Sequence, residues 1–147
     1  MIYLASDHAG MELKGKILEH LKSSGQQAED CGPFTFDKAD DYPDFILPCA
    51  EKVAKNPGSM GIILGMSGNG EQIAANKVSG IRAALYYGGH EEIVKLARQH
   101  NNANVLSIGA KFISQDEVER AIDLFIETGF EGGRHQRRID KISKFEQ

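Results

Sequence analysis

Residues 61–71 read GIILGMSGNGE, an apolar run followed at once by a glycine-rich turn and a glutamate. The run at 61–65 is apolar at odd and even positions alike, which is typical of a strand buried on both faces of a parallel sheet. The glycines at 68 and 70 suit a tight turn from that strand into a helix, expected from about residue 71 to residue 77. This stretch therefore predicts an α/β fold built around a central buried strand.

Similar apolar runs recur on both sides of this stretch and alternate with helical patterns. Further strands are expected at 2–5, 27–30, 81–86 and 105–108, and helices near 13–21, 43–53, 91–100, 114–129 and 134–145. Alternation of this kind is the pattern of βαβ units. It predicts a three-layer α-β-α sandwich with a Rossmann-type, five-stranded parallel sheet, whose ligands bind at the carboxyl ends of the strands.

Two helices carry apolar stripes. In the helix at 91–100, the spacing of Ile93, Leu96 and Ala97 predicts that all three face the core. The last helix places Ile139, Ile142 and Phe145 on one side.

Length and composition exclude several classes of protein. A chain of 147 residues favours one domain, covering 1–147, and a hydrophobic fraction of 41% is enough for a core. The formal net charge of −4 provides no overall positive field for nucleic acid or an anionic membrane. No secretory signal opens the sequence and no apolar run could span a bilayer, so we expect a soluble, cytoplasmic protein.

Neither the cysteines nor the histidines suggest a metal site. Seventeen residues lie between Cys31 and Cys49, so the pair forms neither a CxxC motif nor a four-ligand zinc site. The five histidines include no HExxH motif, and no pair has clear ligand spacing beside a carboxylate. We expect no metal and no cofactor.

The glycine loop, Ser67-Gly68-Asn69-Gly70, is the strongest local signal. Backbone N–H groups in such a loop, at the start of a helix, bind anions, although plain strand-to-helix turns also use glycines. The third glycine of a dinucleotide fingerprint is replaced by Ile73, and no G-K-[ST] sequence occurs. NAD and nucleoside triphosphates are therefore disfavoured.

Two acidic residues lie near predicted strand ends. Glu71 in a first helical turn is either a favourable partner of the helix dipole or a general base aimed at an anion site. Asp7 is either a helix N-cap beside an incidental His8, or part of a site together with it.

Basic residues cluster late in the chain. His100 stands where a helix ends and could simply interact with the helix dipole. Arg134 and Arg138 are four residues apart on one helix face, which is commonly just solvated but could also clamp a phosphate. RNA binding is the rival use, but no aromatic residues interleave for stacking.

Five segments together resemble ribose-5-phosphate isomerase type B, the family that also contains the galactose-6-phosphate and allose-6-phosphate isomerases. They are SDHAG at 6–10, DYPD at 41–44, GMSGNGEQIAANK at 65–77, RQHNN at 98–102 and GRHQRR at 133–138. The resemblance covers nearly the whole chain in order. It implies a metal-free isomerase that interconverts D-ribose 5-phosphate and D-ribulose 5-phosphate through an enediolate. It also implies a homodimer or a tetramer of dimers, with active sites in the groove between two subunits.

The resemblance also implies roles for individual residues. Many members move the proton with a cysteine at the start of the glycine loop, but Met66 stands there and cannot do so. Another branch reads SGNGE and uses the glutamate, which makes Glu71 the base and Ser67 with the loop N–H groups the site for the enediolate oxygens. By position, the remaining substrate contacts are Asp7, His8, Gly68, Asn69, Gly70, Asn101, Lys111, Arg134 and Arg138, and His100 assists ring opening.

One departure from the family's pattern leaves the identity of the substrate undecided. Lys111 stands where the glutamate branch often has an arginine as a third phosphate ligand, and lysine lacks its bidentate geometry. Two alternatives therefore remain: isomerisation of another sugar phosphate (a galactose or allose 6-phosphate, or a tetrose phosphate), and a binding module without catalysis.

Overall fold

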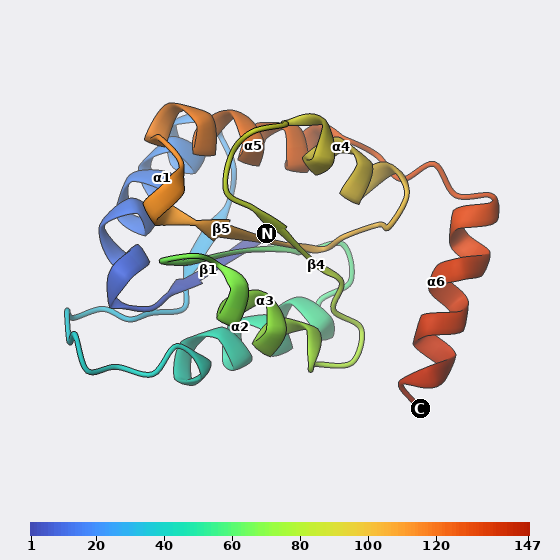
Figure 1. Ribbon diagram of the computed structural model, residues 1–147, viewed down its shortest axis with the longest axis horizontal. Coiled ribbons are helices and arrows are strands. Elements are labelled where there is room, and N and C mark those ends of the chain that lie inside the picture. Colours follow the sequence, from blue (N-terminus) through green and yellow to red (C-terminus); the bar gives the residue numbers. More distant parts are fainter.

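The computed structural model describes residues 1–147, arranged in three layers with one further helix at the side (Figure 1). The strands are β1 (Ile2–Ser6), β2 (Ala28–Asp30), β3 (Met60–Gly65), β4 (Ala83–Tyr86) and β5 (Val105–Gly109). The helices are α1 (Met11–Ser23), α2 (Pro43–Lys55), α3 (Asn69–Asn76), α4 (Glu92–Gln99), α5 (Gln115–Glu127) and α6 (Arg134–Phe145), with short 3₁₀ helices η1 (His8–Gly10) and η2 (Ala110–Phe112).

All five strands are parallel, in the order β2-β1-β3-β5-β4. Gly61 pairs with Val105 where β3 and β5 begin, and Gly65 pairs with Gly109 where they end. Ser6 at the end of β1 pairs with Leu64. The sheet therefore has a carboxyl edge, where Ser6, Gly65 and Gly109 lie together, and an opposite amino edge, where Gly61 and Val105 lie.

Each face of the sheet has its own core. On one face, Leu4, Ile62 and Leu106 pack with residues of α1, α4 and α5. On the other, Tyr3 and Ile63 pack with residues of α2 and α3, and Figure 1 shows these two helices below the sheet. The predicted three-layer sandwich with a five-stranded parallel sheet is confirmed.

The prediction for the inner face of α4 is wrong for two residues. Val94 and Ala97 are buried against the sheet, whereas Ile93 and Leu96 are 49% and 36% exposed. The reason is that α4 has apolar residues on two faces, and the face with Ile93 and Leu96 points away from the core toward α6. On α6, only Ile139 is buried; Ile142 and Phe145 of its apolar stripe are exposed.

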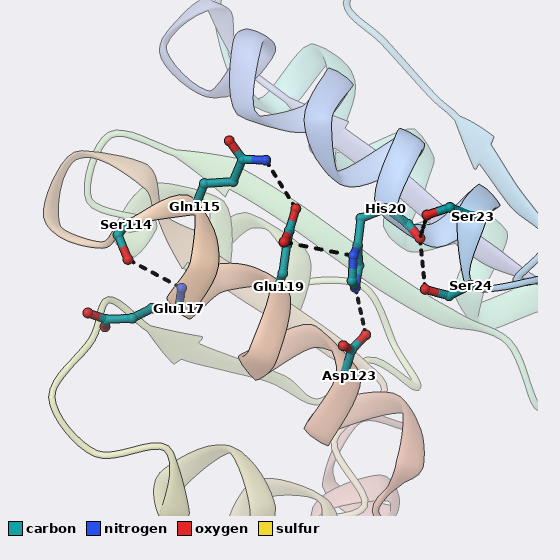
Figure 2. Close-up of polar contacts among 8 residues, drawn as sticks. All are labelled: His20, Ser23, Ser24, Ser114, Gln115, Glu117, Glu119 and Asp123. Atoms are coloured by element: carbon teal, nitrogen blue, oxygen red, sulfur yellow. Dashed lines mark hydrogen bonds and ion pairs between the residues drawn. The ribbon is translucent and has the colours of Figure 1, made fainter.

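Polar side chains fasten α1 to α5 on the outside of the first core (Figure 2). The Nε2 atom of His20 lies 2.8 Å from Oδ1 of Asp123, and Nδ1 lies 3.9 Å from Oε2 of Glu119. At the start of α5, the Ser114 hydroxyl accepts the Glu117 N–H at 3.3 Å and so caps the helix. The contacts of His20 hold α1 against α5.

A buried lysine ties α1 to the loop that follows β2. The Lys14 side chain is 2% exposed and donates to Oδ1 of Asp30 at 2.7 Å and to the Pro33 carbonyl at 2.8 Å. The same Asp30 oxygen accepts the Gly32 N–H at 2.8 Å. These bonds set the path of the chain from β2 toward α2, along the carboxyl edge.

We expect Asp30→Ala to lower the free energy of unfolding by ~2–3 kcal/mol, because it leaves the Lys14 ammonium buried without its counter-charge. Lys14→Met keeps the apolar stem and leaves the partly exposed Asp30 to water, so its loss should be smaller. Urea unfolding measures both. Glu29→Ala is the control. Glu29 is the neighbour of Asp30 in β2 and forms an exposed ion pair with Lys52, so its removal should change stability little. Equal losses in Asp30→Ala and Glu29→Ala would contradict this account.

Candidate active site

The glycine loop lies at the carboxyl edge and is fastened from the β5 side. Gly68 has φ +80°, a backbone conformation that favours glycine, and the buried Ser107 hydroxyl of β5 donates to its carbonyl at 2.8 Å. The Lys111 N–H donates to the Met66 carbonyl at 3.1 Å. Within the loop, the Ser67 hydroxyl accepts the Asn69 N–H at 3.2 Å. The loop is therefore held rigidly where β3 becomes α3.

Glu71 lies in the first turn of α3 and is only 4% exposed. Its carboxyl group packs over Gly65, where any Cβ would overlap the carboxyl atoms. Burial raises the pKa of this carboxyl, the backbone N–H of Glu71 opposes the shift, and the negative Asp7 adds to it. The arrangement supplies a carboxyl group at the carboxyl edge that takes up and releases protons closer to neutral pH than an exposed glutamate does.

Asp7 and His8 follow β1 at the same edge. Asp7 caps η1 by accepting the Gly10 N–H at 3.1 Å, as the N-cap reading of the sequence predicts. The Nδ1 atom of His8 lies 2.7 Å from Oδ1 of Asp40, which also accepts the His8 N–H at 3.3 Å. The hydrogen bond to Asp40 raises the pKa of His8, against a smaller lowering by burial. His8 is thus held by its Nδ1 atom, and its Nε2 atom stays available to contact a ligand.

Sequence reasoning missed two residues of this edge. The Asp40 carboxyl is 7% exposed, with Oδ2 buried and unpartnered. The ring of Tyr42 lies against Gly70, where a Cβ would stand 2.7 Å from the ring carbon that carries the hydroxyl. Both come from the segment before α2. Tyr42 stands in the DYPD segment at 41–44, to which no role was assigned, and Asp40 directly precedes that segment.

The basic residues late in the chain, His100, Arg134 and Arg138, lie at the opposite, amino edge. His100 is the C-cap of α4, as expected for a residue at a helix end, and Asn101 follows it, both before β5 begins at Val105. The His100 ring stacks on that of His135 with centroids 4.2 Å apart, and its Nε2 lies 3.5 Å from Oε1 of Glu131. Burial, together with the neighbouring His100 and Arg134, lowers the pKa of His135. Arg134 and Arg138 are exposed on the first turns of α6.

The structure thus gathers the candidate residues into two groups rather than one. Asp7, His8, residues 67–71 and Lys111 lie at the carboxyl edge, whereas His100, Asn101, Arg134 and Arg138 lie at the amino edge. The four residue steps of β5 alone separate these edges by about 13 Å. Figure 1 shows α6 beside the end of the sheet where β5 begins. A single chain therefore does not bring its two groups together.

An apolar groove runs between α6 and β4, the outermost strand on that side of the sheet. The Asn76 side chain accepts the N–H of Ala83 and donates to its carbonyl, and so pairs part of this outer strand. The Glu146 carboxylate accepts the Gly80 N–H at 2.7 Å and holds the end of α6 near the body. Between these contacts the groove is lined by Leu85, Ile93, Leu96, Asn101, Ile139, Ile142 and Phe145.

Three residues at the amino edge could hold a metal ion. Ligand atoms of His100, Glu131 and His135 all lie within 4.8 Å of one another. Spacing in the sequence did not reveal this group, because its members come from the end of α4, the loop after α5 and the start of α6.

Comparisons with known proteins agree on one family. Residues 2–142 match the family described as Ribose/Galactose Isomerase. Ribose-5-phosphate isomerase B of Mycobacterium leprae is 51% identical over 99% of this chain and 89% of that protein. The crystal structure of ribose-5-phosphate isomerase B from Mycoplasma genitalium with bound ribulose-5-phosphate is 49% identical, with a TM-score of 0.94 over 99% of this chain and 95% of that one. The structure of ribose-5-phosphate isomerase B from Clostridium thermocellum is 38% identical, with a TM-score of 0.93 over 99% of this chain and 96% of that one.

The buried charge of Glu71 should cost stability. Because its pKa is higher in the folded than in the unfolded chain, stability falls as the pH rises through the window between the two values, and the loss is complete above the folded pKa. Glu71→Gln keeps the shape without the charge, so we expect it to raise the melting temperature at pH 7. The gain should vanish at acidic pH, where the wild-type carboxyl is protonated.

Thermal unfolding at both pH values measures this difference. Glu92→Gln, at the exposed first turn of α4, is the control and should show no pH-dependent gain. A Glu71→Gln protein that is less stable than wild type at pH 7 would contradict the effect.

Proposed function

Since the chain belongs to the ribose/galactose isomerase family, we propose that it is an aldose–ketose isomerase that interconverts D-ribose 5-phosphate and D-ribulose 5-phosphate. The observation that carries this assignment is the buried carboxyl group of Glu71 beside the rigid glycine loop. An isomerase of this type needs a base with a raised pKa next to donors that stabilise an oxyanion, and this edge supplies both. The Mycoplasma genitalium structure was solved with bound ribulose-5-phosphate, the proposed ketose.

In the proposed reaction, Glu71 moves one proton. Its carboxylate takes the proton from C2 of the open-chain aldose, the electrons of that C–H bond form the C1–C2 double bond, and the π electrons of the C1 carbonyl move onto O1 to give an enediolate. The proton of the O2 hydroxyl passes to O1, and the protonated carboxyl returns its proton to C1 as the C1–C2 double bond breaks and O2 becomes the ketone oxygen. The Ser67 hydroxyl and the N–H groups of Gly68 and Gly70 would face the negative charge that develops on the oxygens, while the Asn69 N–H donates to the Ser67 oxygen and orients it. Met66 stands in the loop but its thioether cannot exchange a proton.

The second group of residues would bind and open the sugar. His100 transfers the proton that opens the furanose ring, and Asn101 contacts the sugar. Arg134 and Arg138 hold the phosphate with paired guanidinium donors, while Lys111 adds a positive charge from the other edge. Asp7 and His8 contact the sugar from the β1 side, and Asp40 holds His8 in place.

We further propose a homodimer, on its own or as half of a tetramer, in which each active site is shared. The two groups of residues lie at opposite edges of one sheet, so a second copy must supply one of them. The apolar groove beside α6 exposes Ile93, Leu96 and Ile142, the kind of surface that a subunit interface buries. In a twofold dimer, each subunit would supply Arg134 and Arg138 to the glycine loop of the other.

Three further parts of the proposal concern the setting of the enzyme. The reaction needs no metal and no cofactor, because a carboxylate and hydrogen-bond donors suffice for it. Residues 1–147 act as one sugar-phosphate isomerase domain. We place the protein in the cytoplasm, where its two unpaired cysteines would stay reduced. No helix in the structure combines the length and apolarity needed to cross a membrane.

The proposed activity is tested with purified protein, D-ribose 5-phosphate and EDTA. Wild type should isomerise the sugar, and Glu71→Gln should lose roughly 10²–10⁴-fold in kcat because the general base is gone. Glu92→Gln, another first-turn glutamate, should keep its turnover. Full turnover in Glu71→Gln would remove Glu71 from the role, and faster reaction with a hexose 6-phosphate or tetrose phosphate would change the substrate.

Mixing two impaired variants tests the shared site. Glu71→Gln lacks the base and should lose turnover, whereas Arg138→Ala lacks a phosphate ligand and should be impaired mainly in KM. In a mixed dimer with shared sites, one site carries both changes and the other carries neither. At substrate concentrations far below the KM of Arg138→Ala, random pairing should therefore restore about a quarter of wild-type activity on co-expression. No recovery, with mixed dimers present, would place both groups of each site in one chain.

A further inference from the structure

We propose that His100, Glu131 and His135 form a binding site for Zn²⁺ or a similar first-row divalent ion, and that its occupation inhibits the isomerase. The three side chains come from three parts of the chain, yet their ligand atoms lie within 4.8 Å of one another. The inhibitory part rests on the proposed role of His100.

The ligand set decides the class of metal. Two imidazoles and one carboxylate suit Zn²⁺, Co²⁺, Ni²⁺ or Cu²⁺, whereas Mg²⁺ and Ca²⁺ prefer oxygen ligands. Two histidines and a glutamate are also a known three-ligand set for zinc, which leaves a fourth position open to water. The site at the amino edge therefore has the composition of an open zinc site.

The distances require only side-chain movement. In a tetrahedral site, with metal–ligand distances of about 2.0–2.2 Å, ligand atoms stand roughly 3.3 Å apart. Nε2 of His100 and Oε1 of Glu131 are already 3.5 Å apart. The stacked rings of His100 and His135, at 4.2 Å and 11°, present their edges side by side and need to tilt toward a common point. His100 and Glu131 are 39% and 49% exposed, so these two side chains can rotate toward His135, the most buried of the three.

The backbone holds the three ligands near one another without a metal. The Glu131 N–H donates to the Gln99 carbonyl at 3.0 Å, which fastens the loop after α5 to the end of α4. The His135 N–H donates to the Gly132 carbonyl at 3.2 Å, which fixes the first turn of α6. Because the backbone already holds the three side chains close together, binding an ion costs little conformational entropy.

Metal binding and ring opening would compete for the same atom. A bound ion takes the lone pair of His100 Nε2, the atom that faces Glu131, and so removes a proton carrier from the sugar. It also places positive charge beside Arg134 and Arg138 and alters how they hold the phosphate. Inhibition should be reversible, because a chelator removes the ion.

Binding is tested by calorimetric titration of chelator-free wild-type protein with Zn²⁺, and by the visible absorption of Co²⁺ in the same site. We expect one ion per chain, and at least about tenfold weaker binding in His135→Ala and in Glu131→Gln. His90→Ala removes an exposed histidine outside the group and should bind as wild type does. Equal Zn²⁺ affinity in wild type, His135→Ala and Glu131→Gln would overturn the site.

Inhibition is measured on the same proteins with D-ribose 5-phosphate. Zn²⁺ should lower the turnover of wild type and of His90→Ala, and EDTA should restore it. The same Zn²⁺ concentrations should leave the turnover of His135→Ala at its metal-free value. Zn²⁺ binding that depends on the three residues but leaves wild-type turnover intact would overturn the inhibitory part alone. A wild type inactive on every sugar phosphate, yet binding Zn²⁺ through these residues, would instead contradict the proposed function and leave the metal site standing.

Discussion

The central strand β3 is hydrogen-bonded to β1 on one side and β5 on the other, and helices cover both of its faces. A one-residue shift of this strand would exchange the side chains that the two cores receive, Ile62 and Leu64 on one face and Ile63 on the other, and so disrupt the packing of both. The position of its end at Gly65 is therefore fixed, and with it the turn at residues 66–68 and the start of α3. Glu71 is buried because that first helical turn lies directly over the strand end. The placement of the proposed base thus follows from the burial of a strand that carries no chemistry.

A buried carboxylate is unfavourable, and the surrounding polar contacts explain how the edge accommodates it. The Glu71 N–H favours the charged form and opposes the effect of burial, while Asp7 increases that effect. Around the carboxyl, separate hydrogen bonds hold each neighbouring segment: Ser107 holds the glycine loop, Asp40 holds His8, and Lys14 with Asp30 holds the chain between β2 and α2. Each polar group therefore has a fixed position before any ligand arrives, which is what electrostatic stabilisation of an oxyanion requires.

The carboxyl edge could largely be predicted from the sequence, whereas the arrangement of the other residues could not. The run at 61–65 and the SGNGE segment carry their structure locally, so β3, the turn and the first-turn position of Glu71 follow from residues within one short stretch. Ile93 and Leu96 were misplaced because spacing identifies an apolar face but does not say whether the core or a groove covers it. Asp40 lies 32 residues from His8, and Glu131 lies 31 residues after His100, so neither contact leaves a periodic or short-range signal.

The distribution of residues between the two edges links assembly to catalysis. Helix α6 carries Arg134 and Arg138 at its start and Ile139, Ile142 and Phe145 along the face toward the groove. The same helix would therefore bind phosphate and form the subunit contact, with Arg138 directly before Ile139 in the sequence. In the proposed dimer, a shift of α6 that loosens the interface would also move Arg134 and Arg138 away from the partner's glycine loop, because one helix carries both the phosphate ligands and the apolar contact face. An isolated chain keeps Glu71 in place but has no phosphate clamp opposite it, so the proposed dimer would complete the proposed active site.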